Sequence, residues 1–557
     1  MRLGQIFTRR DVLRGIGGIG AGSALTGLTG YASGTETAAP PALATEGEIL
    51  KDLPQVCSRS GVLDHTVTVA TTHPVVGGRQ LHLDTYNGHL PGELWRVRPG
   101  DRVRVLLRNL MEATSVPKAP GACAGPARDH GGSPHHTSAG CAPHTGEHAA
   151  VGQALVRAAV TTNLHAHGLQ VSPSGQSDNV SISVAPQGSH QYVYDIPENQ
   201  PAGLFWYHPH FHTSTTHQGW SGLAGPIVVE GDIDCVPEIA DMRERTVIIS
   251  ALRVDGHGEN PTVAVLATGG DEPYATDPTV HADMLYTLNG QLRPVACIRP
   301  GETQRWRVLN ATPHREMWLH IEGHTLHWIG QDGIPLSYSR PMPNLMLATG
   351  NRAEFVLRGG APGRYRIYAA PYHQGPARAE RPALELGTLE VTGPTAWGRI
   401  PQRLVDPPCM PDLPVARRRT LVISRDPSAK AGGGARFLIN NQAYSMNRID
   451  QEAEAGTVEE WRLVNRDTFQ HPMHIHVNPF QVVDIKGIPA NDTSWQTDPS
   501  VWWDTYRLPP GGEITLRIYF RPDATGKTVY HCHVLPHEDN GTMGNLLISP
   551  PHGTTGT

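Results

Sequence analysis

The stretch Thr85–Asn109, TYNGHLPGELWRVRPGDRVRVLLRN, contains the unit that decides the fold. It has an Asn-Gly turn, then a Pro-Gly turn, then an alternating run that ends in Asn. Alternation such as RVRVLL has the two-residue period of a β-strand, and Gly and Pro mark its ends. Related stretches begin at Thr287, TLNGQLRPVACIRPGETQRWRVLN, and at Leu438, LINNQAYSMNRIDQEAEAGTVEEWRLVN. Three copies of one β unit predict three related β-sandwich domains.

The composition agrees with this organisation. A chain of 557 residues has room for three domains at the usual size of about 100–200 residues each. Its 60 glycines, 48 prolines and 38% hydrophobic residues suit a loop-rich all-β protein. A net charge of -6 and a pI near 6.6 make nucleic acid an unsuitable partner. The unusual feature is the 30 histidines, and the function is sought there.

The N-terminus, residues 1–44, is predicted to be a cleaved export signal. Arg9 and Arg10 precede a glycine-rich, weakly apolar run, which resembles a twin-arginine signal, and Ala42-Leu43-Ala44 is a small-residue cleavage site. The alternative is a membrane anchor, but the run is poor in Leu, Ile and Phe for a span of about 20 residues. We expect export to the periplasm or the cell exterior, with no stable membrane span.

The domain boundaries follow from the repeats and from changes in composition. The first domain is predicted at 45–230, the second at 231–395, and a linker with the third domain at 396–557; Pro-rich DPPCMPDLP, from Asp406, marks that linker. A segment at about 111–160 lacks periodicity and is predicted to be a surface insertion in the first domain. Its histidines either belong to a solvated flexible loop or gather copper: His130, His135, His136, His144 and His148.

Four short histidine clusters stand apart from the rest. They are HAHG (His165, His167), WYHPHFH (His208, His210, His212), HPMHIH (His471, His474, His476) and HCHVLPH (His531, Cys532, His533, His537). In a strand, residues i and i+2 share a face, so His-x-His presents two imidazoles to one metal cluster. In His531-Cys532-His533 the histidines face one side and the cysteine faces the other. One strand can therefore serve two metal sites joined by a residue or two of backbone.

The ligand types indicate copper. One thiolate with two imidazoles is the ligand set of a blue-copper electron-transfer site, and Cys532 with His537 and His471 supplies it. Eight further histidines, without carboxylate or sulfur, fit a copper cluster that binds oxygen. Zinc prefers closed sites with two cysteines a few residues apart, and the sequence has no such pair. The middle repeat has histidines at other offsets and no Cys-His cluster, which predicts no copper of its own.

The motifs, their order and the three repeats together resemble the multicopper oxidases, of the bacterial three-domain laccase-like type, over nearly all of the chain after the signal. The resemblance implies three cupredoxin-like Greek-key sandwiches with a trinuclear copper cluster between the first and third. It implies four copper ions, with His471, Cys532 and His537 on type 1, and His165 and His474 on type 2. The type 3 pair would be held by His167, His208, His210, His476, His531 and His533. His212 has no ligand counterpart and is expected to support a ligand's orientation.

Two acids match family positions near the cluster. Reduction of O2 to water takes up four protons, so carboxylates are needed as relays. Asp178, in SGQSDN, matches an acid beside the type 2 copper, and Glu538 matches one on the dioxygen side. The alternative for each is the cap of a turn.

One position departs from the family pattern. Thr542 stands where relatives usually have Met, Leu or Phe, and Met543 follows it. Three outcomes are open: a three-coordinate type 1 site with a raised potential, a register shift that brings in Met543, or an impaired site.

The seven cysteines leave the disulfides undetermined. If Cys532 binds metal, six cysteines allow 15 pairings: Cys57, Cys123, Cys141, Cys235, Cys297 and Cys409.

The predicted function is a copper-dependent oxidase. It would oxidise phenolic or aromatic reductants near His471, one electron at a time, and pass the electrons through Cys532 to the cluster, where O2 becomes water. One alternative is a metallo-oxidase acting on Cu(I), Mn(II) or Fe(II), although the 11 methionines form no cluster of the kind that suits Cu(I). Another is a copper-binding paralogue without turnover. A two-domain copper nitrite reductase is disfavoured by the third repeat. The expected partners are O2 and a small reductant.

Overall fold

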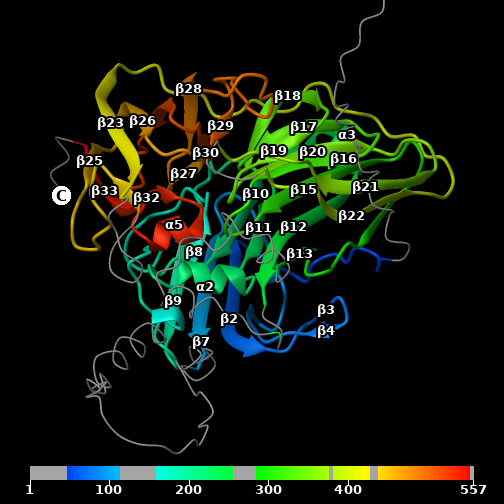
Figure 1. Cartoon of the computed structure of the whole chain (residues 1–557), viewed down its shortest axis with the longest axis horizontal. Coiled ribbons are helices and arrows are strands. Elements are labelled where there is room, and N and C mark those ends of the chain that lie inside the picture. Colours follow the sequence, from blue (N-terminus) through cyan, green and yellow to red (C-terminus); the bar gives the residue numbers. More distant parts are fainter. Residues whose placement is uncertain are drawn as a thin grey trace, which may run out of the picture. The chain divides into compact units, whose positions relative to one another are not determined.

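The computed structural model describes residues 47–112, 158–254, 258, 284–375, 380–426 and 437–551. The predicted signal and the histidines of the predicted insertion lie outside these ranges. Within them strands dominate and the helices are few and short (Figure 1), which confirms the all-β class. None of the helices described is long and apolar enough to cross a membrane.

The first domain contains two sheets, with strand orders β1-β6-β11-β10-β8 and β5-β2-β7-β9, and a two-stranded ribbon of β3 and β4. Its strands are β1 (Gln55–Cys57), β2 (Val62–Thr72), β3 (Val75–Val76), β4 (Arg79–Gln80), β5 (Leu83–Tyr86), β6 (Leu94–Val97), β7 (Arg102–Asn109), β8 (His165–His167), β9 (Ser189–Asp195), β10 (Gly203–His208) and β11 (Gly225–Val229). The helix α2 (Thr215–Trp220) lies between β10 and β11 in the chain.

The middle domain follows the short helices η1 (Asp232–Cys235) and α3 (Pro237–Ala240). Its sheets have the orders β13-β12-β15-β20-β17-β18 and β14-β22-β21-β16-β19. Its strands are β12 (Arg243–Arg253), β13 (Met284–Leu288), β14 (Val295–Ile298), β15 (Thr303–Asn310), β16 (Met317–Ile321), β17 (Leu326–Gln331), β18 (Ile334–Met342), β19 (Leu345–Leu347), β20 (Arg352–Arg358), β21 (Gly363–Ala369) and β22 (Leu384–Val391).

The third domain has sheets in the orders β24-β23-β26-β31-β28-β29 and β25-β33-β32-β27-β30. Its strands are β23 (Val415–Arg425), β24 (Phe437–Ile439), β25 (Gln451–Glu454), β26 (Val458–Asn465), β27 (His471–Ile475), β28 (Phe480–Lys486), β29 (Trp502–Trp503), β30 (Thr505–Leu508), β31 (Glu513–Tyr519), β32 (Gly526–Cys532) and β33 (Met543–Ser549), with the helix α5 (Leu535–Asp539) between the last two.

The sheet orders show that the domains repeat one topology. The orders of the third domain match those of the middle domain strand for strand, with each label raised by 11. In the first domain most strands have the same order of neighbours, although the label offset varies; for example, β2, β7 and β9 correspond to β12, β15 and β20. The prediction of three related sandwiches is therefore confirmed.

The predicted strand alternation is realised differently in the first and middle domains. In β7 the residues alternate between buried and more exposed, as the RVRVLL pattern predicts. In β15, where QRWRVL has a similar pattern, all eight residues are buried. The reason is that Arg305 and Arg307 point into a buried ion network, where their nitrogens lie 2.7 and 2.9 Å from the carboxylate oxygens of Glu354.

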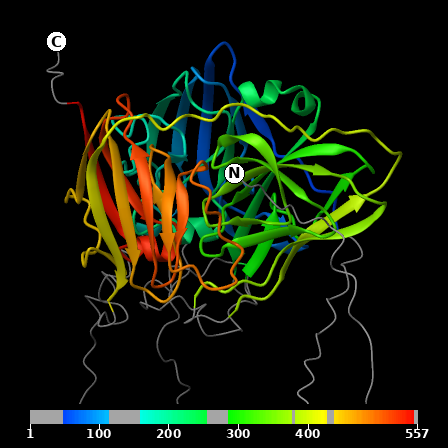
Figure 2. The same ribbon diagram turned by 90° about the horizontal axis from the view of Figure 1, so that it is seen from above.

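Apolar packing connects the domains unequally. One continuous core cluster combines residues of the middle and third domains, among them Trp306 and Trp461, and Figure 2 shows the green strands of the one beside the yellow-to-red strands of the other. The first domain has its own core around Trp95. It meets the third domain at α2 and α5, which lie side by side (Figure 1), where the Asp539 carboxylate accepts hydrogen bonds from the Thr213 and Thr216 amides.

Candidate metal centre

Strand register brings the four histidine clusters together. In the first domain β8 pairs with β10, so that His165 lies opposite His208. In the third domain β27 pairs with β32, so that His474 lies opposite His531 and Met473 lies opposite Cys532. Residues directly opposite on antiparallel strands point to the same face. The histidine rows of the two domains therefore form one buried set of imidazoles.

Three ring nitrogens converge at one side of this set. The Nε2 atom of His210 lies 3.0 Å from that of His531, and the Nε2 atom of His476 lies 3.1 Å from both. Glu538 lies behind two of these rings, with carboxylate oxygens 3.1 Å from His531 Nδ1 and 3.6 Å from His210 Nδ1. The three Nε2 atoms are thus arranged as the ligands of one metal ion.

His165 and His474 form a second pair, each held by its other nitrogen. Both carboxylate oxygens of Asp178 lie 2.9 Å from His165 Nδ1, and His474 Nδ1 donates to the Asp504 carbonyl at 2.7 Å. The Nε2 atoms of both rings are buried and have no hydrogen-bond partner among the described residues. Such partners fix the ring orientation and leave the opposite nitrogen for a metal.

His167, His208 and His533 complete the set. The Nδ1 atom of His167 lies 3.4 Å from His208 Nε2, and the His533 ring centroid lies 5.1 Å from that of His167 and 5.5 Å from that of His208. The other nitrogen of His167, Nε2, is 3.2 Å from the Asp504 carboxylate. Neither ring nitrogen of His533 has a hydrogen-bond partner among the residues that the structure describes.

The electrostatics suit metal binding. All eight rings of the cluster are at most 3% exposed, and burial is the main cause that lowers their pKa values. The pKa of His210 and of His531 falls to about 4 and that of His474 to about 3; the other five lie well below the ordinary value. The imidazoles are therefore neutral at physiological pH, which is the form that binds metal. Buried neutral nitrogens without partners fit the copper cluster that the sequence predicts.

The cysteine has its own site on the opposite face of β32. The Cys532 sulfur lies 3.4 Å from His471 Nδ1 and 3.6 Å from His537 Nδ1, and all three side chains are buried. The Phe437 ring stacks on His537 with centroids 4.1 Å apart, and Phe469 packs against His471 at 4.7 Å. One sulfur and two imidazoles in an apolar enclosure fit the blue-copper ligand set.

The strand register also decides what lies beside this cysteine. Met543 lies opposite His531 on β33, so it shares the face of the histidines. Thr542 accepts a hydrogen bond from the Cys532 amide through its carbonyl at 3.0 Å, so its side chain shares the cysteine's face. The Thr542 hydroxyl is buried and has no hydrogen-bond partner within the described ranges. The register shift that would bring in Met543 does not occur.

The two predicted acids both lie at the histidine cluster. Burial raises the pKa of Asp178 to about 7 and that of Glu538 to about 7. Asp178 also accepts the Ala166 amide at 2.9 Å, which fixes its carboxylate beside β8. Both carboxyls thus have pKa values near neutral pH, where a group can take up and release protons.

The sequence interpretation missed two further acids. Asp504 contacts both His167 and His474, and Asp467 lies 3.6 Å from His471 Nε2. An acid in the apolar run VWWDTYRL was the one available signal for Asp504. His212, in contrast, packs edge-on against Tyr444 with centroids 4.8 Å apart and belongs to none of the groups of converging ligand atoms among the described residues.

The cysteines outside the metal site are not paired with one another where the structure describes them. Cys57, Cys235, Cys297 and Cys409 are free, and Cys123 and Cys141 lie outside the described residues.

The fold and the site define a class: a three-domain β-sandwich protein with a buried histidine cluster between its first and third domains and a buried cysteine site within the third. Sequence models of the multicopper oxidase family match residues 156–233, 253–394 and 413–552. The chain belongs to the multicopper oxidase family, in its three-domain form. Membership implies that it binds copper.

Several named proteins resemble this chain in sequence. Multicopper oxidase mco of Staphylococcus aureus is 24% identical over 402 residues, covering 70% of this chain and 77% of its own length. Laccase of Bacillus subtilis is 25% identical over 386 residues, covering 65% and 73%. Cell division protein FtsP of Escherichia coli is 27% identical over 374 residues, covering 64% and 72%.

Solved structures share the fold. A multicopper oxidase from Campylobacter jejuni, a metallo-oxidase, superposes with a TM-score of 0.69 at 24% identity, covering 90% of this chain and 95% of that one. A laccase-like multicopper oxidase, CueO, from Ochrobactrum gives 0.67 at 22% identity, covering 90% and 100%. These neighbours confirm the prediction of cupredoxin-like domains.

Proposed function

We propose that the protein is a laccase-like oxidase that couples one-electron oxidation of phenolic or aromatic reductants to the four-electron reduction of O2 to water. The observation that carries this proposal is the pairing of the two sites through one strand, in which His531 and Cys532 are adjacent residues on opposite faces of β32. Bound copper would supply both the electron transfer and the oxygen chemistry. Four electrons and four protons convert one O2 into two waters.

We propose the copper ligands that the family resemblance implies. Together these residues would hold four copper ions. The convergence of His210, His476 and His531 supports one type 3 ion, and the contacts of His167, His208 and His533 support the other. The Nε2 atoms of His165 and His474, which have no hydrogen-bond partner in the described part of the chain, support the type 2 ion. The contacts of Cys532 with His471 and His537 support type 1.

The backbone at Cys532 joins the sites. His531 Nδ1 donates to the Cys532 carbonyl at 3.1 Å, so one hydrogen bond and a few covalent bonds separate the thiolate from a ring of the histidine cluster. His533 follows on the other side of the cysteine. Electrons entering at His471 or His537 would cross this short and buried path.

Asp178 and Glu538 are proposed as the proton carriers. Each is buried beside a proposed ligand, and each has a carboxyl pKa of about 7. They contact different rings of the cluster, Asp178 at His165 and Glu538 at His531. This arrangement would supply protons at two places in the cluster.

A second candidate function is oxidation of a metal ion such as Mn(II) or Fe(II). The Asp467 carboxylate lies 3.6 Å from the outer nitrogen of His471, and first-row metal ions accept carboxylate ligands. The structure of the Campylobacter jejuni multicopper oxidase, which is a metallo-oxidase, has the same fold and is compatible with this candidate. A third candidate, a copper-binding paralogue without turnover, is raised by the FtsP relatives and by Thr542; the complete set of proposed ligands speaks against it.

We also propose that the three domains span residues 45–230, 231–395 and 396–557, the last with its linker. We propose further that the segment 1–44 directs export of the protein. Metal loading before translocation would suit the deep burial of the copper ligands.

The first experiment is the copper content and visible absorption spectrum of the air-oxidised, copper-loaded protein. We expect four coppers per chain and an intense blue thiolate band. Oxygen consumption is then compared with a phenol and with Mn(II) or Fe(II), in the unchanged protein and in Asp467→Asn. A loss restricted to metal ions favours the second candidate. Full copper without oxygen consumption from any of these reductants contradicts both oxidase proposals.

A further inference from the structure

We propose that the middle domain sets the geometry of the trinuclear site through one turn, Thr349–Arg352. Among the described residues, none of the groups of converging ligand atoms lies in that domain. The turn nevertheless reaches the residues that hold His167, His474 and His533. The inference rests on the proposed function, because it takes these three histidines as copper ligands.

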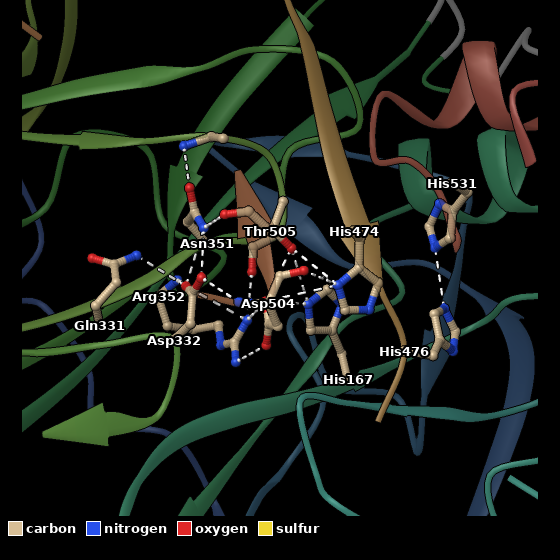
Figure 3. Close-up of polar contacts among 12 residues, drawn as sticks. His167, Gln331, Asp332, Asn351, Arg352, His474, His476, Asp504, Thr505 and His531 are labelled. Carbon is tan, nitrogen blue, oxygen red and sulfur yellow. Dashed lines mark hydrogen bonds and ion pairs between the residues drawn. The ribbon is translucent and has the colours of Figure 1, made fainter. Parts of the chain in front are cut away.

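Arg352 is the centre of the contact. Its guanidinium is 0% exposed and binds the Asp504 carboxylate with two parallel hydrogen bonds, Nη1 to Oδ1 at 2.9 Å and Nη2 to Oδ2 at 2.6 Å. Two carbonyls hold the same group in place, Leu204 at 3.1 Å from Nε and Gly350 at 3.0 Å from Nη1. One side chain of the middle domain thus bonds the first domain through the Leu204 carbonyl. It bonds the third domain through Asp504, as Figure 3 shows.

Asp504 transmits this contact to two proposed ligands. Its carboxylate accepts a hydrogen bond from His167 Nε2 at 3.2 Å, and its main-chain carbonyl accepts one from His474 Nδ1 at 2.7 Å. Each bond fixes which nitrogen carries the proton and leaves the opposite nitrogen for metal. Figure 3 shows the two imidazoles next to each other, both beside this one aspartate. Fixing Asp504 therefore fixes one type 3 ligand and one type 2 ligand together.

Two glycines show how closely the turn and the cluster approach. At Gly168, which ends HAHG with φ +85, a Cβ would lie 2.4 Å from Arg352 Nη2 and 2.7 Å from Asp504 Oδ2. At Gly350, with φ +87, a Cβ would lie 2.9 Å from the His533 ring. Both positions need glycine for the backbone conformation and for the space. The glycine of the turn lies directly against a proposed ligand.

The other two residues of the turn hold the third domain by its backbone. The Thr349 hydroxyl donates to the His533 carbonyl at 2.8 Å. The Asn351 amide donates to the Thr505 carbonyl at 2.9 Å and to both oxygens of Asp332, at 3.1 and 2.9 Å. Each of the four residues of the turn therefore contacts a ligand or a residue beside one.

Arginine is the residue type that this place requires. Its planar fork matches a carboxylate in two parallel bonds, whereas a lysine ammonium is a point charge. A lysine at 352 keeps the positive charge but cannot hold both oxygens of Asp504 and both carbonyls in one plane. Arg352 is accordingly a positioning residue, acting through Asp504.

The test compares two pairs of variants. Arg352→Lys is matched with Arg307→Lys, because Arg307 is also 0% exposed and also binds carboxylates in the middle domain, those of Glu354, Glu244 and Asp234. Gly350→Ala is matched with Gly78→Ala, because Gly78 has φ +79 but nothing within 4 Å of an added Cβ. Copper content is measured over a range of free copper, with the EPR spectrum of type 2 copper and the blue band of type 1.

We expect Arg352→Lys to weaken copper binding at the trinuclear site by about 10- to 100-fold, the usual effect of losing a ligand's supporting contact, and to change the type 2 EPR signal. Gly350→Ala should lower the copper content of the trinuclear site, because the added methyl would displace His533, a proposed type 3 ligand. The blue band should remain in both variants, because the described contacts of the turn do not include Cys532, His471 or His537. Both matched controls should keep the copper content and the spectra of the unchanged protein.

Two results overturn the inference. One is an unchanged type 2 signal and copper affinity in both Arg352→Lys and Gly350→Ala. The other is loss of the blue band together with the type 2 signal, or the same changes in the control variants, since the turn would then serve folding alone. The proposed function fails separately, when the unchanged protein itself lacks the type 1 and type 2 signals.

Discussion

Met543 lies directly opposite His531 in the antiparallel pair of β32 and β33, so the residue before it, Thr542, faces the side of Cys532. The proposed type 1 site therefore has a buried hydroxyl at the position where the family resemblance implies Met, Leu or Phe. A hydroxyl is a weak ligand for copper, so Cys532 and two histidines would be the donors. Since the axial ligand tunes the potential, this position is the first to test.

Thr542→Met is predicted to lower the reduction potential of the type 1 copper, because an added thioether donor stabilises Cu(II) more than Cu(I). Redox titration of the blue band measures it. Thr542→Val should leave the potential near that of the unchanged protein.

Met473 also lies opposite Cys532, on β27, and packs into the apolar core. Met473→Leu should therefore leave the potential unchanged. A large shift in that variant would identify Met473 as the axial donor and contradict the three-coordinate site.

Asp178→Asn is predicted to slow oxygen reduction by about 10- to 100-fold, as loss of a ligand's supporting contact does. The amide keeps one acceptor oxygen for His165 but loses the negative charge and the second oxygen. Steady-state oxygen consumption and the type 2 EPR signal measure the effect, and the blue band should stay unchanged. The control is Asp195→Asn, an exposed aspartate of the same domain that pairs with Arg102. Equal rates for Asp178→Asn and the control would remove Asp178 from the mechanism.

His476→Ala is predicted to lose copper from the type 3 pair, whereas His212→Ala should retain the full content. His476 contributes one of three converging Nε2 atoms, but His212 packs against Tyr444 outside that group. Metal analysis of both purified variants gives the comparison, and the blue band reports whether the third domain is folded. A copper loss in His212→Ala equal to that in His476→Ala would show that His212 is needed for binding.

The proposed ligands could be predicted from the sequence because strand periodicity alone puts His165 with His167 and His531 with His533. No comparable spacing of residues in the sequence predicts that Arg352 and Asp504 lie beside these histidines. Asp504 meets His167 across 337 positions of sequence and Arg352 across 152, and these contacts depend on how three domains pack. For the same reason the sequence predicts only that the middle domain has no copper of its own, although its turn, Thr349–Arg352, contacts residues of the proposed site.

The sequence alone also could not predict that the Thr542 side chain lies on the same face as Cys532. Helix α5 lies between β32 and β33, and a one-residue change in that connection would exchange Thr542 for Met543 beside Cys532. The buried arginines of β15 show the same limit, since alternating polar residues normally predict a solvent face. Their buried carboxylate partners come from other strands and loops.

Copper removal is predicted to destabilise the folded protein markedly. Without metal, the Nε2 atoms of His165 and His474 and both ring nitrogens of His533 are buried and have no hydrogen-bond partner among the residues that the structure describes. Each such group costs about 1–3 kcal/mol. A ligand that binds only the native state stabilises it by about 4 kcal/mol at a free concentration a thousand times its Kd. Scanning calorimetry of chelated protein titrated with Cu(II) should show the Tm rising with the logarithm of free copper. His474→Ala should show a smaller rise, because it removes one of these nitrogens, and a Tm independent of copper would contradict metal binding by the buried histidines.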